Sequence, residues 1–120
     1  MLALNKGYKM ARVLPIELKE FDATGVDGTW QEWGSVFANP VLKIQVYNTS
    51  DVDFYFSRDQ TNKYRVPAGG TLTLDESTLY FRGVDQEYYF PKGTQLYVKQ
   101  VTGAGTEGNF IGNFVTRILP

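Results

Sequence analysis

The sequence predicts an all-β, single-domain antiparallel β-sandwich, jelly-roll-like, with about eight short strands. Several stretches alternate between apolar and polar side chains, which is the period of a half-buried strand. Clusters of Gly, Pro, Asn and Asp separate these stretches at short intervals. No stretch shows the apolar spacing of a convincing helix. Many short strands with frequent turns are typical of a sandwich or jelly roll, in which each strand buries one face.

The chain has 120 residues, which is enough for one domain with one core. Residues 1–9 have no clear period and are predicted to be an N-terminal arm. Residues 10–120 are predicted to form the sandwich domain. Hydrophobic residues make up 42% of the chain, which excludes a disordered tail, and no apolar run approaches the length of a membrane span.

Composition argues against several classes of function. The chain has no histidine and no cysteine, so the usual general base, the usual partner of a Ser nucleophile and the thiolate ligands of zinc are all missing. We therefore expect no enzyme, with carboxylate-only catalysis left open. The net charge is -1 and the basic residues are scattered, so we expect neither nucleic acid nor membrane as a partner.

The strongest local signal lies at residues 41–59. In each half of this stretch, apolar and polar side chains alternate, so that the apolar set lies on one face and the polar set on the other. The apolar sets are Leu42, Ile44 and Val46, then Val52, Phe54 and Phe56. Residues 48–51 between them are turn formers whose side chains can bond to their own backbone. The pattern predicts a β-hairpin with one buried face.

Other strands are expected on both sides of this hairpin. Residues 10–19 alternate, with Leu14, Ile16 and Leu18 on one face, and Pro15 favours an edge position. A loop is expected at residues 22–29 and a strand at 30–37. Further extended pieces are predicted at residues 64–66, 71–75, 79–81, 88–90, 94–101 and 109–119, with a single helical turn possible at 75–78.

Carboxylates are the first candidates for a site. Loop aspartates on a sandwich can hold calcium. In this chain Asp22 and Asp27 share one loop, Asp51 and Asp53 flank the start of a strand, and Asp59 closes that strand. They lack the dense alternation of a calcium loop, so turn capping is the preferred interpretation. We expect no metal and no cofactor.

Aromatic residues make up 15% of the chain and supply the candidate interface residues. Trp30 and Trp33 are three positions apart, so on a regular strand one faces the core and the other faces out. Three tyrosines fall on polar strand faces, and an exposed group of them would suit a protein interface or a sugar-stacking platform. The candidates are Trp30, Trp33, Tyr47, Tyr55 and Tyr97.

Several segments resemble small structural proteins of tailed bacteriophages. The resemblance lies in the runs at residues 46–53 (VYNTSDVD), 56–59 (FSRD), 66–70 (VPAGG), 72–75 (LTLD) and 91–99 (PKGTQLYVK), and covers about residues 41–118. It implies a β-sandwich virion component of the head–tail or tail accessory type, or a capsid decoration. The family has no catalytic motif to transfer.

From this resemblance we expect a non-enzymatic virion protein, present in many copies and acting through protein–protein contacts. Its partners would be capsid, portal or connector, or tail components and other copies of itself. It would be located in the virion and assembled in the host cytoplasm. The alternative is a carbohydrate-binding module for host-surface recognition, in which the same aromatic residues stack on sugar rings.

Overall fold

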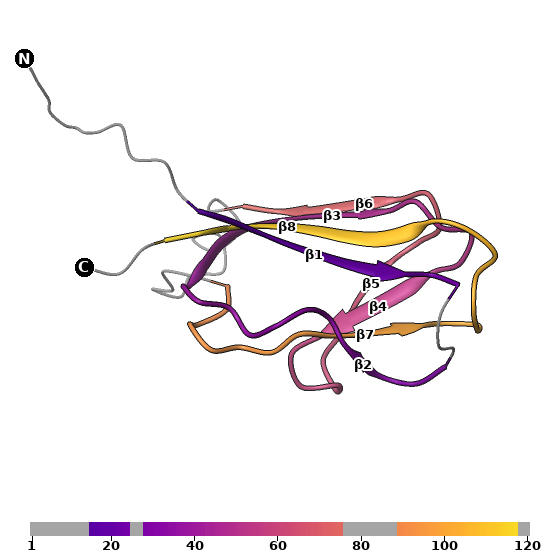
Figure 1. The fold of residues 1–120 in the computed structure, drawn as a ribbon, viewed down its shortest axis with the longest axis horizontal. Helices are drawn as coiled ribbons and strands as arrows, with labels where there is room; N and C mark the ends of the chain where they lie inside the picture. Colours follow the sequence, from indigo (N-terminus) through magenta and orange to yellow (C-terminus); the bar gives the residue numbers. More distant parts are fainter. Residues whose placement is uncertain (1–14, 25–27, 76–88, 118–120) are drawn as a thin grey trace, which may run out of the picture.

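A computed structural model describes residues 15–24, 28–75 and 89–117. These residues form eight strands and no helix (Figure 1). The strands are β1 (Ile16–Asp22), β2 (Gln31–Glu32), β3 (Val41–Asn48), β4 (Phe54–Ser57), β5 (Tyr64–Val66), β6 (Thr71–Leu74), β7 (Tyr97–Gln100) and β8 (Asn109–Thr116). The predicted all-β fold is confirmed. The expected arm at residues 1–9, the helical turn at 75–78 and the piece at 79–81 lie outside the described residues, wholly or in part.

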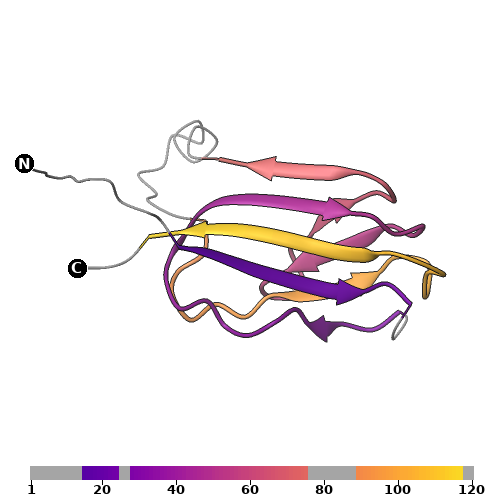
Figure 2. The same ribbon diagram turned by 45° about the horizontal axis from the view of Figure 1, so that its top comes forward.

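The strands form two antiparallel sheets of four, with the orders β1-β8-β3-β6 and β2-β7-β4-β5. The sheets lie face to face as two layers (Figures 1 and 2). The pairing is nested, because β1 pairs with β8, β2 with β7, β3 with β6, and β4 with β5. A long antiparallel hairpin rolled into two sheets gives this nesting, and with eight strands it is the jelly-roll arrangement. Strand β1 lies at a sheet edge, as Pro15 predicted.

Aromatic rings fill the space between the sheets. Trp33 is fully buried, and its ring centroid lies 4.8 Å from that of Phe110, 5.5 Å from Phe114 and 5.6 Å from Phe56. These rings pack directly on the backbone of β8 at Gly112, where an added Cβ would lie 2.5 Å from the Phe114 ring and 2.7 Å from Trp33. Burying each large side chain contributes about 1.5–3 kcal/mol, so this cluster is the main source of cohesion between the two layers.

The hairpin predicted over residues 41–59 is wrong. Strand β3 pairs with β6 and β8, while β4 pairs with β5 and β7, so the two expected partners lie in opposite sheets. Asn48, which is buried, donates to the carbonyl oxygens of Val52 at 2.7 Å and Val66 at 3.1 Å, and these bonds fix the crossing between sheets. Alternation cannot distinguish a turn from a crossing, because each strand buries one face either way.

The strand expected at residues 30–37 is also much shorter than predicted. Only Gln31–Glu32 pairs as β2, and the chain then runs irregularly to Pro40. Gly34 has a φ of +70°, a left-handed conformation that ends the extended geometry. The segment still borders the residues before β7, because Trp33 N–H donates to Leu96 O at 2.8 Å and Phe37 N–H donates to Thr94 O at 3.1 Å.

Candidate functional site

Three of the five predicted interface residues lie together on the outer face of the sheet β2-β7-β4-β5. Tyr55 of β4 is paired with Lys99 of β7 and with Arg65 of β5. Tyr97 of β7 shares the outward side with Lys99, because the residues between and after them, Val98 and Gln100, are buried. Trp30 precedes β2, next to Lys99. Of the three tyrosines predicted on polar strand faces, Tyr55 and Tyr97 therefore share one outer face with Trp30, whereas Tyr47 lies in the other sheet.

Cations cover two of these aromatic rings. The Lys99 ammonium lies 5.0 Å from the Trp30 ring centroid. The Lys63 ammonium lies 5.1 Å and the Arg65 guanidinium 5.8 Å from the Tyr55 ring centroid. Such contacts contribute about 0.5–1 kcal/mol at exposed sites. We call the outward residues Trp30, Tyr55, Lys63, Arg65, Tyr97 and Lys99 the aromatic–cationic face.

Asp53 organises one end of the aromatic–cationic face. It accepts hydrogen bonds from Arg65 Nη2 at 2.6 Å and from the backbone N–H of Ala68 at 2.8 Å. The hydrogen bond from Arg65, followed by the one from Ala68, holds the pKa of Asp53 below its usual value, and the same bond raises the pKa of Arg65. The pair fixes where the guanidinium lies and so keeps Arg65 beside Tyr55.

Trp33 is not an interface residue. Its relative exposure is 0%, and its ring is held among Phe56, Phe110 and Phe114 between the sheets. The predicted placement of one tryptophan inside and the other outside is confirmed, with Trp33 inside and Trp30 partly exposed. Naming both as interface candidates was wrong for Trp33, because a side chain in the core is closed to any partner.

Tyr47 lies on the opposite side of the molecule, on the outer face of β1-β8-β3-β6. The strands align in register, so Tyr47 is beside Ile111, and Ile111 is beside Glu20 of β1. The most exposed large hydrophobic side chains of the sheet are on β1: Ile16 is 63% exposed and Leu18 60% exposed. We call the outward apolar residues Ile16, Leu18, Tyr47, Ile111 and Val115 the apolar face.

The apolar alternation of β1 favours burial of Ile16 and Leu18, but the structure buries the opposite side of the strand. Ile16 and Leu18 face solvent, while Lys19 is only 4% exposed. Burial lowers the pKa of Lys19. Its ammonium lies 4.3 Å from the Phe37 ring centroid and donates to Ser35 O, and a Cβ at Gly34 would lie only 3.2 Å from Lys19 Cγ. The methylene stem of a lysine can fill apolar space while its charged end finds a carbonyl, which makes this orientation possible.

A second inward contact fixes the same orientation. The Glu17 carboxylate accepts a hydrogen bond from the backbone N–H of Ala38 at 3.1 Å. Seven consecutive residues of β1 are paired with β8 without a break in register. Because a slip of one residue would turn every side chain to the other face, these contacts hold Ile16 and Leu18 on the outside.

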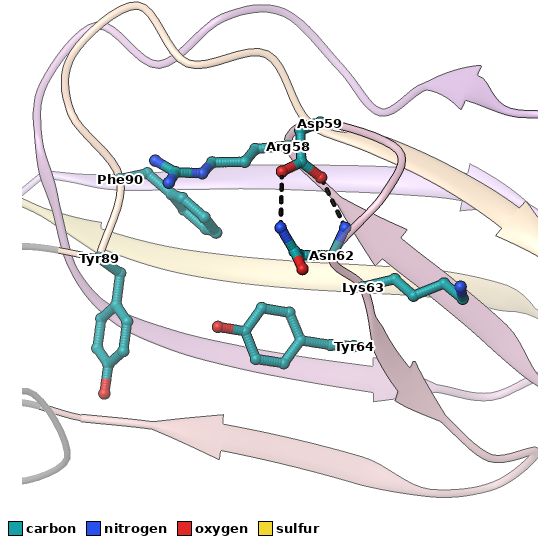
Figure 3. Close-up of a pocket in the computed structure, with 7 residues that line it drawn as sticks. All are labelled: Arg58, Asp59, Asn62, Lys63, Tyr64, Tyr89 and Phe90. Carbon is teal, nitrogen blue, oxygen red and sulfur yellow. Dashed lines mark hydrogen bonds between the residues drawn. The ribbon is translucent and has the colours of Figure 1, made fainter. Parts of the chain in front are cut away.

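A partly open hollow of about 460 Å³ lies beside the loop between β4 and β5 (Figure 3). It is lined by Arg58, Asp59, Asn62, Lys63, Tyr64, Tyr89 and Phe90. In Figure 3 the guanidinium of Arg58 reaches toward Phe90, and the Tyr64 hydroxyl points into the same space, whereas Lys63 points away. The Tyr64 ring is held by stacking on Phe56, with centroids 5.0 Å apart. Sequence analysis did not identify this hollow, because residues far apart in the chain form it.

Asp22 and Asp59 cap turns, as predicted, whereas Asp51 joins its loop to Thr106 and Asp27 lies outside the described residues. Asp59 accepts backbone N–H bonds from Thr61 at 2.9 Å and Asn62 at 2.8 Å, and these bonds hold its pKa far below the usual value. Asp51 accepts from the hydroxyl of Thr106 at 2.5 Å and from its N–H at 2.9 Å, which also lowers the pKa of Asp51. No group of three or more potential metal-ligating residues occurs in the described part of the chain.

Within residues 15–24, 28–75 and 89–117, no helix is long and apolar enough to cross a membrane. Comparison of the chain with models of protein families, with curated protein sequences and with solved structures gave no match.

Proposed function

We propose that the chain is a non-enzymatic structural protein of a tailed bacteriophage particle, a multi-copy accessory of the head–tail or tail region or of the capsid surface. The observation that carries the proposal is the apolar face, with Ile16 and Leu18 exposed on a strand that is paired with β8 along its whole length. Exposed apolar patches on soluble proteins mark sites of interaction with other macromolecules.

The fold supports the proposal by analogy. Eight-stranded jelly rolls occur in viral capsid proteins, although one fold serves many functions. The two outer faces lie on opposite sides of the sandwich, so one copy could contact two neighbours at once (Figure 1). Repeated contacts in a ring or lattice raise the overall avidity even when each single interface is modest.

The partners would be capsid, portal or connector, or tail proteins and further copies of the chain. The protein would be located in the virion after assembly in the host cytoplasm. Quantitative mass spectrometry of purified particles of the encoding phage tests this. We expect the chain at a fixed stoichiometry of several copies per particle, retained after a high-salt wash. Its absence from purified particles would refute the proposal.

A carbohydrate-binding module is the second candidate, and the hollow beside the loop between β4 and β5 favours it. The hollow combines an aromatic ring, Tyr64, with hydrogen-bonding groups on Arg58 and Asn62, a combination that suits a sugar. A glycan array discriminates between the two candidates. Saccharide binding that disappears in Tyr64→Ala but persists in Tyr47→Ala would favour the module, and no binding to any glycan would exclude it.

A further inference from the structure

The pattern of side chains on the apolar face identifies what could cover it. The outward residues of β1, β8 and β3 form three aligned rows: Ile16, Val115 and Lys43; Leu18, Asn113 and Gln45; Glu20, Ile111 and Tyr47. Each of these nine residues is at least partly exposed, while the residues that alternate with them on β8 are buried. These three strands therefore carry a three-by-three array with Asn113 at its centre, and the exposed Thr71 and Thr73 of β6 continue the face beyond Tyr47 and Gln45.

The charges of the array occupy opposite corners. Glu20 of β1 and Lys43 of β3 are diagonal to each other across Asn113. Among the described residues neither of them forms an ion pair. One positive and one negative corner on the same face is the arrangement in which two copies of the face complement each other, since a two-fold axis pairs residue i with j and j with i.

From this array we propose that the apolar face binds the same face of a second copy of this chain. A two-fold axis along the other diagonal, from Ile16 through Asn113 to Tyr47, brings each Glu20 opposite the partner copy's Lys43. The same axis places Leu18 against Val115, and Ile16 against its own counterpart. The two Asn113 amides meet at the centre, where each can donate to the other.

This contact combines apolar residues of β1 and β8 with a polar centre at Asn113 and charges at two corners. Ile16 and Leu18 are 63% and 60% exposed, so most of their surface is available to be buried. The inward contacts of Lys19 and Glu17 hold β1 in register, so the face is formed before the second copy arrives. Rigid, preformed surfaces lose less conformational entropy on association, which favours binding. The inference deepens the proposed function by assigning one face to self-assembly.

Sedimentation equilibrium across a concentration series tests the proposal on the full chain. We expect a monomer–dimer equilibrium for the wild type. Leu18→Ser should raise the dissociation constant about tenfold or more, because it removes the apolar contact with Val115 of the second copy. Val36→Ser is the matched control, since Val36 is also exposed, at 50%, but lies before β3 and outside the array. It should leave the dissociation constant unchanged.

Charge reversal tests the identity of the partner. Glu20→Lys and Lys43→Glu should each weaken the dimer, because each places like charges opposite each other. The double variant should restore it, since the two corners are then exchanged in both copies. Circular dichroism confirms that each variant is folded. A wild type that is monomeric at all concentrations, a double variant that is not restored, or a Val36→Ser variant as weak as Leu18→Ser would each overturn the proposal.

The failure of this inference can be separated from failure of the proposed function. A chain that is present in many copies in purified particles but monomeric in solution, with no effect of Leu18→Ser on incorporation, would refute self-docking and leave the virion role standing. A chain that forms the dimer and shows the charge rescue but is absent from particles would refute the virion role and leave self-docking standing.

Discussion

The two outer faces of the sandwich differ in how they cover their nonpolar surface. On the aromatic–cationic face, Lys99 lies over Trp30 and Lys63 over Tyr55. On the apolar face, Ile16 and Leu18 have more than half of their surface open to solvent. The number of aromatic residues on a face is therefore not a measure of its exposed apolar area, because neighbouring side chains decide how much of that area stays exposed.

The difference follows from cross-strand neighbours. Tyr55 is paired with Lys99 and Arg65, whose long stems can fold across a ring. Ile16 and Leu18 are paired with Val115 and Asn113, which are too short to cover them. Among the described strands β1 is also at the edge of its sheet, so no described strand on its other side contributes a covering side chain.

The largest expected difference in stability is between substitution of the buried Trp33 and substitution of Trp30 on the aromatic–cationic face. Trp33→Ala should reduce the free energy of unfolding by about 3–5 kcal/mol, since it leaves a cavity among three aromatic rings. Trp30→Ala should cost less than about 1 kcal/mol, because Trp30 is only partly buried and loses one cation contact. Urea denaturation measures both. Equal losses would contradict the assignment of inner and outer tryptophans.

The next effect compares the two sides of β8. Gly112→Val should lower the free energy of unfolding by about 1–3 kcal/mol or more, because its Cβ would collide with the rings of Phe114 and Trp33. Asn113→Val, one residue further, changes an outward position and should stay within about 0.5 kcal/mol.

The Asn113→Val variant also tests which interactions hold the apolar faces of two copies together. Asn113→Val adds apolar surface at the centre of the array, so it should tighten self-association measured by sedimentation. Weaker association would show that the Asn113 amides matter more to the contact than apolar area does.

A smaller effect should follow from uncovering a ring on the aromatic–cationic face. Lys99→Met keeps the length of the side chain but removes the charge over Trp30, and should cost about 0.5–1 kcal/mol. Lys92→Met, at an exposed lysine in the turn before β7, is the control and should be neutral. Thermal denaturation reports stability, and acrylamide quenching of tryptophan fluorescence reports exposure of the ring. Identical behaviour of the two variants would show that the contact between Lys99 and Trp30 contributes nothing to stability.

The smallest expected effect is on the loss of stability at low pH. The pKa of Asp53 is lowered in the folded chain by its hydrogen bond with Arg65, so the stability it contributes is complete above its ordinary pKa of 3.8 and is lost as pH falls further. Asp53→Asn should therefore make the loss of stability below about pH 4 slightly shallower. Urea midpoints at pH 3 and pH 7 measure this. A steeper loss in the variant would reverse the assigned sign.

Much of the fold could be predicted from local pattern. The alternation of Ile44 and Val46 with Gln45 and Tyr47 matches the buried and exposed sides of β3, because a side-chain period of two is a property of the strand itself. The pattern also places Tyr47, Tyr55 and Tyr97 on polar strand faces. Which of them lie in neighbouring strands of one sheet could not be predicted, since it depends on pairing between segments distant in the chain.

Other features depended on tertiary structure. Tyr47 and Tyr55 are separated by a short, turn-like segment, yet they face opposite sides of the molecule because Asn48 fixes a crossing between the sheets. The hollow beside the loop between β4 and β5 combines that loop with Tyr89 and Phe90, which no local pattern connects.

The sequence by itself determined that this chain is a set of short strands folded as a sandwich around aromatic residues. Only the tertiary structure decided which face of β1 is inside. The apolar alternation of Ile16 and Leu18 favoured burial, but the space under β1 is shaped by Phe37 and the carbonyl of Ser35, and it accepts the stem and ammonium of Lys19. Hydrophobic patterning acts along one strand, whereas burial is decided by the partners that the rest of the chain provides.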